Sequence, residues 1–393
     1  MQPALTHLGI ACALGTDAQA VLSRLVAGST AGMIATDRYS PGRTLTVGPV
    51  QVELPSIAHA PPQLRSRNNQ LLLQALLPLR SAIAKAKQRY GAGRIAVVLG
   101  TSTSGVAEAE AAYLGRGEDG SFPAAFDYRQ MEVGNPSEFV ATELGLSGPA
   151  MTISTACSSS AKALLTGRRL LRQGLCDAAI VGGADTLSRF TVSGFGALEA
   201  VSPERCNPMS KNRKGINIGE GAALFLMTAE GGPVRLRGGG SSVDAHHVSA
   251  PDPTGNGAED AMRAALSDAR LEPAAIDYVN LHGTATPHND AMESKAVERV
   301  FGSGVSMSST KPLTGHTLGA AGAIEAAFCW LLLGRENAAQ RLPPHVYDGE
   351  FDPELPPLSL VKAEQRAERL SRIMSVSFGF FGNNAALILE AQP

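Results

Sequence analysis

One cysteine and two histidines stand where short apolar runs end and helix-like segments begin. Cys157 follows the run 153–156 and precedes a segment rich in serine and alanine. Because a helix N-terminus carries partial positive charge and unpaired amides, we expect a lowered pKa and a nucleophilic thiol there. His282 ends an apolar run, and His316 precedes a helix; a neutral imidazole held there can donate a hydrogen bond to a developing oxyanion. From this pattern alone, a buried inert cysteine and two structural histidines remain the alternative.

Two charged residues lie in otherwise apolar surroundings. Lys311 is close in sequence to His316, and Glu325 lies within the apolar segment 318–333. Buried charges need partners, so we expect these two side chains to pair with each other. A purely structural salt bridge is an equally good interpretation from the sequence.

An internal repeat would bring these residues together. Three pairs of segments resemble each other in the same order: 95–103 and 276–286, 153–157 and 307–311, and 222–226 and 385–389. Alternating strands and helices predict two similar α/β halves, 1–230 and 231–393, with sheets covered by helices. Cys157, His282 and the segment from Lys311 to His316 then lie at strand ends in corresponding parts of the halves, where they can share one cleft.

The elements that position these residues follow from periodicity and end signals. The N-terminal segment 1–15 lacks the positive region of a signal peptide and is predicted to be a strand. The apolar segment 318–333 is too short for a membrane span and is predicted to be a buried helix. The other expected helices are 17–27, 70–90, 158–173 with Gly174 as a stop, 258–269 and 290–300.

Composition excludes several classes of protein. The 393 residues are 44% hydrophobic and 18% charged, which rules out disordered and collagen-like chains. With 34 basic and 36 acidic side chains, the net charge of −2 gives no electrostatic reason to expect nucleic acid or an anionic membrane. The five cysteines are scattered, so we predict no metal site, no disulfide framework and a cytoplasmic location.

Some strings match short motifs without their required context. Gly115 to Gly120 spells G-x-G-x-x-G but follows a helical stretch and carries acidic residues where a pyrophosphate would sit. Ser159 to Lys162 spells S-x-x-K without its partner motifs. His246, His247 and His288 lack an H-E-x-x-H context. We assign none of these strings to a site.

Taken together, the ordered motifs resemble the elongating β-ketoacyl-acyl-carrier-protein synthases of the thiolase-like superfamily. The likeness covers essentially the whole chain, and the order of the motifs makes it specific. They are T-A-C-S-S at 155–159, N-P-x-x-x-x-R-x-G-x-x-x-G-E-G at 207–221, H-G-T-x-T-P at 282–287, T-K-x-x-T-G-H-x-L-G-A-A-G at 310–322 and S-F-G-F-x-G-x-N at 377–384. The resemblance implies a layered α-β-α-β-α architecture.

The resemblance also implies a mechanism, a decarboxylative Claisen condensation. Cys157 would take an acyl group from the phosphopantetheine arm of an acyl carrier protein, so the enzyme needs no cofactor of its own. His282 and His316 would support the loss of carbon dioxide from malonyl-carrier protein and stabilise the enolate. The resemblance further assigns an oxyanion hole to the amides of Cys157 and Phe380, a supporting ion pair to Lys311 and Glu325, and substrate binding to Thr284, Thr286, Phe378 and Phe381.

The chain departs from the family pattern at two places. Phe381 stands where the closing loop usually has glycine, which we expect to reshape that loop and the choice of acyl chain. The segment 67–73 is similar to ketosynthases of aryl-polyene pathways, so fatty-acid, polyene and polyketide synthesis all stay open. Arg65 and Arg67 are candidate contacts for an acidic carrier protein.

Rival functions are a thiolase or initiating synthase, and a non-catalytic chain-length partner. Two histidines in H-G-T and T-G-H motifs disfavour the first, and the presence of Cys157 disfavours the second. By resemblance, we expect a dimer that is either a homodimer or a heterodimer with a ketosynthase-like chain.

Overall fold

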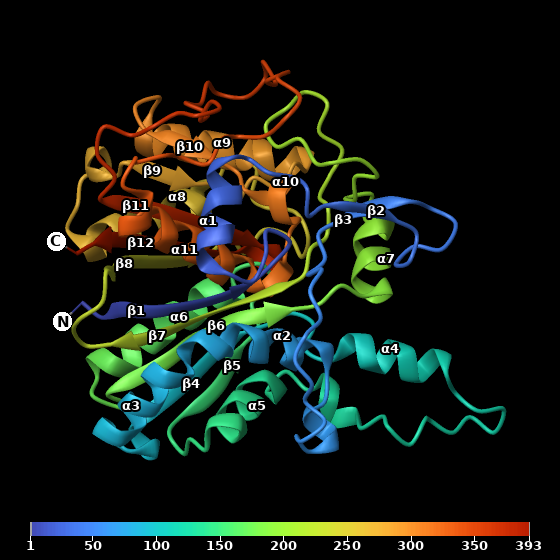
Figure 1. The fold of residues 1–393 in the computed structure, drawn as a ribbon. Coiled ribbons are helices and arrows are strands. Elements are labelled where there is room, and N and C mark those ends of the chain that lie inside the picture. Colours follow the sequence, from blue (N-terminus) through green and yellow to red (C-terminus); the bar gives the residue numbers. More distant parts are fainter. Residues whose placement is uncertain (1, 393) are drawn as a thin grey trace.

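The computed structural model describes residues 2–392 and contains one large mixed sheet (Figure 1). Its strand order is β10-β9-β11-β12-β8-β1-β7-β6-β4-β5. A separate two-stranded hairpin, β2 (Ile34–Thr36) and β3 (Leu45–Val47), lies outside it. The large sheet contains β1 (Ala4–Ala11), β4 (Ile95–Gly100), β5 (Ala150–Ile153), β6 (Ala178–Asp185), β7 (Gly221–Thr228), β8 (Val234–Val243), β9 (Tyr278–Asn280), β10 (Ser306–Ser308), β11 (Arg372–Gly379) and β12 (Asn383–Ala391).

The two halves of this sheet repeat the same pattern. In β1-β7-β6-β4-β5 the first two pairings are antiparallel and the last two parallel, and β8-β12-β11-β9-β10 follows the same sequence of pairings. The halves join where β1 pairs with β8, at Ala4 with Arg235 and Leu5 with Val234. The three pairs of segments that resemble each other in sequence overlap β4 and β9, β5 and β10, and β7 and β12, so each pair lies at equivalent places in the two halves of the sheet.

Helices form three layers around the two half-sheets. In the central layer, α6 (Ser159–Arg172) packs on β4 and β6, and α11 (Ala321–Leu332) packs on β11 and β7. One outer layer holds α2 (Arg67–Leu76), α3 (Arg80–Tyr90) and α5 (Asn135–Leu144), and the other holds α8 (Asn256–Ala269) and α9 (Pro287–Phe301). This is the expected α-β-α-β-α architecture. The remaining helices are α1 (Ala18–Val26), α4 (Val106–Leu114), α7 (Arg189–Ala197) and α10 (Lys311–Thr314).

Small residues let the central helices approach each other closely. A Cβ added at Gly322 of α11 would lie 2.8 Å from the backbone nitrogen and the Cβ of Ala161 in α6. On the opposite side of α6, a Cβ at Gly167 would lie 2.3 Å from Val181 of β6. Such distances leave no room for a methyl group, so glycine at these positions sets how tightly the central layer packs.

The expected helices form, with one correction. The segment 70–90 is not one helix: α2 is followed by a 3₁₀ turn, Leu77–Leu79, and then by α3. Pro78 causes the break, because proline has no amide hydrogen to donate and its ring clashes with the preceding turn. Within residues 2–392 we find no helix that has both the length and the apolar character to cross a membrane. The predicted boundary at 230/231 falls in the turn between β7 and β8.

Candidate active site

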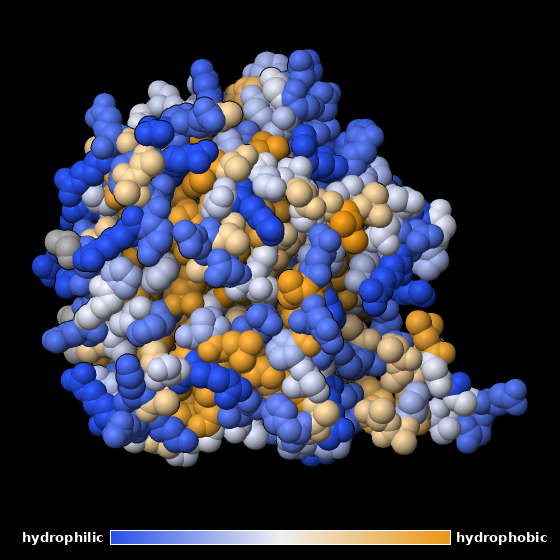
Figure 2. Space-filling view, viewed as in Figure 1, coloured by the Kyte–Doolittle hydropathy of each residue, from blue (hydrophilic) through white to orange (hydrophobic). Residues whose placement is uncertain are grey.

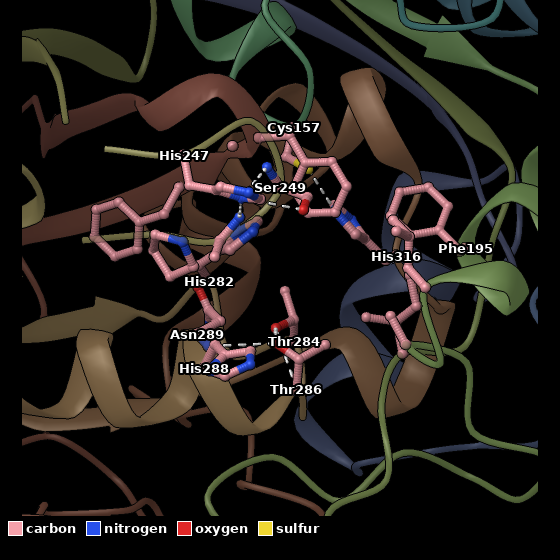
Figure 3. A pocket seen from close by; sticks show the side chains of 18 of the residues that line it. Cys157, Phe195, His247, Ser249, His282, Thr284, Thr286, His288, Asn289 and His316 are labelled. Atoms are coloured by element: carbon pink, nitrogen blue, oxygen red, sulfur yellow. Dashed lines mark hydrogen bonds between the residues drawn. The ribbon is translucent and has the colours of Figure 1, made fainter. Parts of the chain in front are cut away.

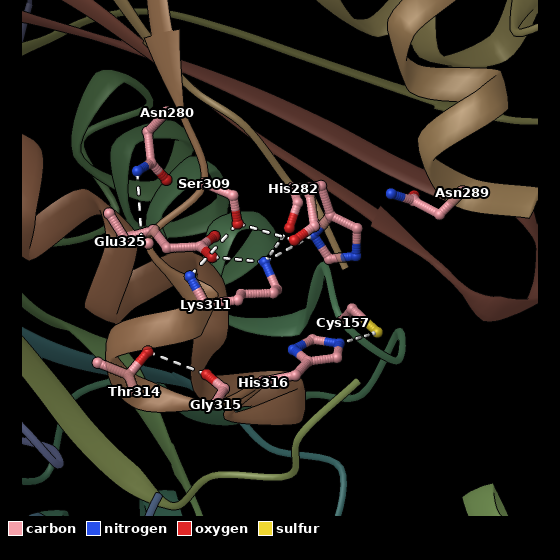
Figure 4. Close-up of polar contacts among 12 residues, drawn as sticks. Cys157, Asn280, His282, Asn289, Ser309, Lys311, Thr314, Gly315, His316 and Glu325 are labelled. Atoms are coloured by element: carbon pink, nitrogen blue, oxygen red, sulfur yellow. Dashed lines mark hydrogen bonds and ion pairs between the residues drawn. The ribbon is translucent and has the colours of Figure 1, made fainter. Parts of the chain in front are cut away.

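Cys157, His282 and His316 meet in one place (Figure 4). Their ligand-type side-chain atoms all lie within 4.8 Å of one another. His316 Nε2 is 3.0 Å from Cys157 Sγ, and the two imidazole rings meet edge to face with their centroids 5.3 Å apart. Cys157 comes from the N-terminal half of the chain and both histidines come from the C-terminal half. The sequence therefore predicted correctly which side chains converge.

The turn that carries Cys157 is held by a neighbouring serine. The Ser159 hydroxyl accepts a hydrogen bond from Thr155 N at 2.8 Å and donates one to Ala156 O at 2.6 Å. Ala156 adopts φ 52°, a left-handed conformation that costs energy for any residue with a Cβ. This sharp turn between β5 and α6 places the sulfur at the start of α6, where it is 7% exposed.

His282 is fixed on both its backbone and its ring side. Glu293 of α9 accepts hydrogen bonds from the amides of His282, at 2.6 Å, and Gly283, at 2.7 Å. Lys311 Nζ contacts the His282 carbonyl and lies 3.3 Å from its Nδ1. Because the Lys311 ammonium group only donates, His282 Nδ1 must accept, and its hydrogen is on Nε2. Sequence analysis missed Glu293, and burial raises the pKa of this carboxyl to about 7.

Lys311 and Glu325 form the expected ion pair deep in the protein. Lys311 Nζ lies 2.6 Å from Glu325 Oε1, and both side chains are buried. Burial raises the pKa of Glu325, and the neighbouring Lys311 opposes that rise. The pair links α11 to the strand-end loop that carries His282.

His316 is placed by the backbone of the 207–221 motif. Its amide donates to Asn217 O at 2.7 Å, and its carbonyl accepts from Gly219 N at 2.9 Å. Gly315 adopts φ 70°, and a Cβ there would lie 2.8 Å from Gly219 N. The glycine of the T-G-H motif is therefore needed for the histidine backbone to approach so closely.

Burial sets the protonation of all three groups. The pKa values of His282 and His316 lie well below the ordinary value, first because of burial and then because of the Lys311 charge. Burial raises the pKa of the Cys157 thiol to about 11, although Lys311 and the Phe380 amide act against that rise. Our expectation of a lowered thiol pKa at a helix N-terminus is therefore wrong, because loss of water outweighs the favourable charges. The resting site has a neutral thiol and two neutral imidazoles.

Two backbone amides point at the sulfur. The Phe380 amide donates to Cys157 Sγ, and the amide of Cys157 itself also faces the sulfur. Gly379 brings the two segments together, since a Cβ there would lie 3.1 Å from Cys157 N. This position is compatible with the oxyanion hole that the resemblance assigns to the amides of Cys157 and Phe380, and that role stays a prediction.

A cavity of about 340 Å³ opens onto these groups (Figure 3). Phe378, Thr284 and Thr286 line it, as predicted, and the two threonine hydroxyls lie 3.0 Å apart. Phe381 is not among the residues that line the cavity, and it is 59% exposed. The prediction that Phe381 contacts substrate is therefore not supported by its position. The other lining residues are Phe195, Leu198, Ala200, Ile216, His247, Ser249, Ala250, Pro251, His288, Asn289, Gly379, Phe380 and Asn384.

Two histidines that sequence analysis set aside also line this cavity, His247 and His288. His247 Nδ1 accepts hydrogen bonds from the amides of Ser249 and Ala250, both at 3.2 Å, so its hydrogen lies on Nε2. No local motif marks His247, which only the folding of the β8–α8 loop brings to the cavity, whereas His288 directly follows the motif at 282–287. In contrast, Arg67 does not line the cavity and is held in an ion pair with the buried Glu220 at 2.5 Å.

Comparison with known protein families identifies the family of this chain. The family description "Beta-ketoacyl synthase, N-terminal domain" matches residues 64–231, and "Beta-ketoacyl synthase, C-terminal domain" matches residues 234–345. The chain belongs to the β-ketoacyl synthase family. It is therefore an acyltransferase-type enzyme that forms carbon–carbon bonds.

Individual β-ketoacyl synthase relatives support this assignment. Nodulation protein E of Rhizobium sp. (strain N33) is 32% identical over 400 residues, which cover 98% of this chain and 97% of that protein. The 3-oxoacyl-[acyl-carrier-protein] synthase 2 of Staphylococcus aureus (strain COL) is 34% identical over 268 residues, 64% of each chain. A chain from the solved complex of a ketosynthase with its chain length factor, from Xenorhabdus doucetiae, is 44% identical, with a TM-score of 0.94 and coverage of 100% and 98%.

Proposed function

We propose that this β-ketoacyl synthase is a catalytic 3-oxoacyl-[acyl-carrier-protein] synthase with Cys157 as its nucleophile. The observation that carries the proposal is the convergence of the Cys157 thiol, His282 and His316 on one cavity, with two amides aimed at the sulfur. The substrates are an acyl thioester and a malonyl thioester, both carried by an acyl carrier protein. No metal or resident cofactor is needed, because the phosphopantetheine arm belongs to the carrier.

In the first half-reaction the acyl group moves to Cys157. The thiol proton passes to His316 Nε2, 3.0 Å away, while the sulfur attacks the thioester carbonyl carbon. The amides of Cys157 and Phe380 hold the oxyanion that forms. When the carbon–sulfur bond to the carrier breaks, the proton on His316 returns to the leaving pantetheine thiolate. Thr284 and Thr286 offer hydroxyls to the amides of the pantetheine arm.

In the second half-reaction the malonyl group loses carbon dioxide. The electrons of the broken carbon–carbon bond move to the thioester oxygen, forming an enolate. His282 donates a hydrogen bond from Nε2 to that oxygen and His316 lies beside it, so a buried site without a metal can hold the charge. The enolate carbon then attacks the acyl–Cys157 carbonyl, which gives 3-oxoacyl-carrier protein and releases the Cys157 thiolate. This thiolate takes up one proton from solvent, which restores the neutral thiol. Burial, and after it the charge of Lys311, lowers the pKa of both imidazoles and keeps them neutral, as this step requires.

The surface supports assembly with a second chain. Large apolar side chains are exposed on α4 and on the segment that follows it: Tyr113, Leu114, Phe122, Tyr128 and Val133. Figure 1 shows this part projecting from the body, and Figure 2 shows apolar residues gathered over it. Exposed patches of this kind mark interaction sites. We propose a dimer in the cytoplasm, formed with a second copy or with a ketosynthase-like partner.

A specific pathway is favoured by one comparison. The chain from the complex of a ketosynthase with its chain length factor is 44% identical along this entire chain, and a chain from the ishigamide ketosynthase/chain length factor structure is 28% identical with a TM-score of 0.89. We therefore favour a polyene or type II polyketide system over housekeeping fatty-acid synthesis. Co-expression with a nucleophile-free ketosynthase-like chain then yields a stable heterodimer. A fully active homodimer that ignores this chain contradicts the pathway assignment.

The catalytic proposal is tested by mass spectrometry of products. The enzyme is incubated with malonyl-carrier protein and a panel of saturated, polyenoyl and aryl acyl-carrier proteins. Wild type and a Cys176→Ala control, in which a cysteine outside the cavity is changed, form 3-oxoacyl products and an acyl–enzyme adduct. Cys157→Ala forms neither. Full condensing activity in Cys157→Ala refutes the nucleophile assignment.

A further inference from the structure

Lys162, a lysine on the helix that starts beside the nucleophile, has a position that the catalytic groups do not explain. It is the fourth residue of α6 and ends the S-x-x-K string that sequence analysis set aside. The serine of that string, Ser159, forms its hydrogen bonds with Thr155 N and Ala156 O. Lys162 is partly buried and does not line the catalytic cavity. Its role therefore depends on what its ammonium group contacts.

The Lys162 ammonium group contacts the end of the closing loop between β11 and β12. Its Nζ donates a hydrogen bond to Asn383 Oδ1 at 2.8 Å. Asn383 is the first residue of β12 and pairs with Gly379, the last residue of β11. Phe380, whose amide donates to the Cys157 sulfur, lies between these two residues in the chain. One hydrogen bond thus joins α6 to the loop that carries half of the expected oxyanion hole.

The other polar contacts of this loop lead to a different part of the chain. Phe381 N donates to Val248 O at 2.8 Å. Gly382 O accepts from Asp244 N at 3.0 Å. Both partners lie in the segment that follows β8, far along the chain from the nucleophile. The contact from Lys162 instead fixes the loop relative to the helix that begins beside the sulfur.

The surroundings of Lys162 disfavour a positive charge. In the described part of the chain no carboxylate pairs with it, and burial lowers its pKa. Lys162 also lies in the first turn of α6, where the helix dipole is unfavourable to a cation, and that turn contains no acidic residue. A methionine of similar length would avoid both costs. Stability therefore does not explain a lysine at this position.

We propose that Lys162 is a positioning residue that holds the closing loop against α6 and so keeps the Phe380 amide beside Cys157. This inference rests on the proposed function, in which that amide stabilises the oxyanion during acyl transfer. Lys162 acts through Asn383 rather than on the substrate. The loop is strained at Phe381, which adopts φ 62°, so a tether at its β12 end opposes relaxation away from the sulfur.

Single-turnover acylation, compared with alkylation of the same sulfur, tests this role. Lys162→Met should slow acyl transfer from an acyl-carrier protein to Cys157 by about tenfold to a hundredfold, because a misplaced donor stabilises the transition state less well. Iodoacetamide reacts with the thiol without forming an oxyanion, so its rate should stay close to that of wild type. Lys162→Arg keeps a charged donor and should restore much of the acylation rate. Lys85→Met, at an exposed lysine of α3, is the matched control and should change neither rate.

A double-mutant cycle tests whether Lys162 acts through Asn383. Asn383→Ala removes the acceptor, so Lys162→Met/Asn383→Ala should slow acylation no more than either single variant does. The unfolding midpoint of Lys162→Met should equal or exceed that of wild type, because a partly buried cation has been removed. Additive losses in the acylation rate overturn the proposal. So does an equal slowing of acylation and alkylation, because the thiol itself would then be affected.

Hydrogen exchange of the closing loop separates this inference from the proposed function. Loss of the tether should speed amide exchange at residues 380–382 in Lys162→Met, measured by mass spectrometry, whatever reaction the enzyme catalyses. Unchanged exchange overturns the positioning role even if condensation is observed. If wild type forms no acyl–Cys157 adduct, the proposed function fails, whereas faster loop exchange in Lys162→Met still supports the tether.

Discussion

At the scale of single residues, the site works with a thiol that is not ionised at rest. Burial raises the pKa of Cys157 to about 11, and the charge of Lys311 only reduces that effect. Reactivity at neutral pH therefore depends on removal of the thiol proton during the attack, and His316 Nε2 is the neighbouring acceptor at 3.0 Å.

The raised pKa of the Cys157 thiol can be measured by alkylation of Cys157 as a function of pH. We expect the iodoacetamide rate, followed on the Cys157 peptide by mass spectrometry, to keep rising past pH 9 and to level off near the pKa of about 11. The stability linked to this neutral thiol is present below the unfolded pKa of 9.0 and is lost as the pH rises through about 11. An alkylation rate that stops rising below pH 8 would contradict the raised pKa of Cys157.

The buried ion pair yields a second prediction. Replacing Lys311 by methionine leaves the Glu325 carboxyl buried without its partner, so unfolding free energy should fall by about 3 to 5 kcal/mol. Lys311→Met/Glu325→Leu removes both charges and should cost less than the sum of the single changes. Chemical denaturation of the two single variants and the double variant measures this coupling. Additive losses would show that the two residues do not stabilise each other.

Residue types alone were enough to find part of this site. Cys157, His282 and His316 were predicted because Cys157 and His282 follow strand ends, His316 precedes a helix, and each lies in a recognisable motif. The thiol pKa was not predictable, since burial is a property of the folded environment. Glu293 and His247 were missed for a related reason: their sequence neighbours carry no chemical signal, and only tertiary contacts bring them to the site. His288 was set aside although it directly follows the motif at 282–287.

At the scale of elements, the closing loop between β11 and β12 stores backbone strain. Phe381 adopts φ 62° and Gly382 adopts φ 68°, so two consecutive residues are left-handed although only one is glycine. The loop is held in place because Phe381 N donates to Val248 O at 2.8 Å. The exposed ring of Phe381 contributes no cavity contact that offsets the cost.

Adding a glycine and removing a glycine in this loop should change the stability of the protein in opposite directions. Phe381→Gly relieves left-handed strain of about 1 kcal/mol, partly offset by greater freedom of the unfolded chain, and should leave stability unchanged or raised. Gly382→Ala should destabilise the protein, because its Cβ would lie 2.8 Å from Asp244 N. Thermal unfolding of both variants, with acyl-chain preference as a second readout, checks this pair. Stabilisation by Gly382→Ala would rule out the strain argument.

The element predictions failed where a single residue overrides a pattern. The periodicity of 70–90 is helical throughout, yet Pro78 divides it into α2 and α3. Proline has a strong local effect, but it is also tolerated in the first turn of a helix, so its position alone did not reveal that a new helix starts after it. The strands at 95–99 and 222–226 were predicted well because buried strands are continuously apolar.

At the scale of the whole molecule, the central helices determine whether the two halves fit together. Gly322 of α11 lies so close to Ala161 of α6 that an added methyl group must displace one helix. Gly322→Ala should therefore lower unfolding free energy by about 1 to 3 kcal/mol and reduce condensing activity. A matched change at Gly194, where no atom lies within 4 Å of the added Cβ, should be tolerated. Equal stability of the two variants would contradict tight packing in this layer.

The architecture as a whole was predictable because it is duplicated. Three ordered pairs of similar segments indicated two equivalent halves, and each pair occupies equivalent places in the sheet. What the repeat did not reveal is the joint between the halves, because β1 and β8 have no resemblance in sequence that signals their pairing.

The position of β1 has a consequence for synthesis of the chain. Both strands that flank it, β7 and β8, lie more than 200 residues downstream along the polypeptide. During synthesis β1 leaves the ribosome before β7 and β8. This apolar strand therefore stays unpaired until those two strands have been synthesised. Once Val234 and Arg235 are synthesised, the other edge of β1 is available to pair with β8, the first strand of the second half-sheet.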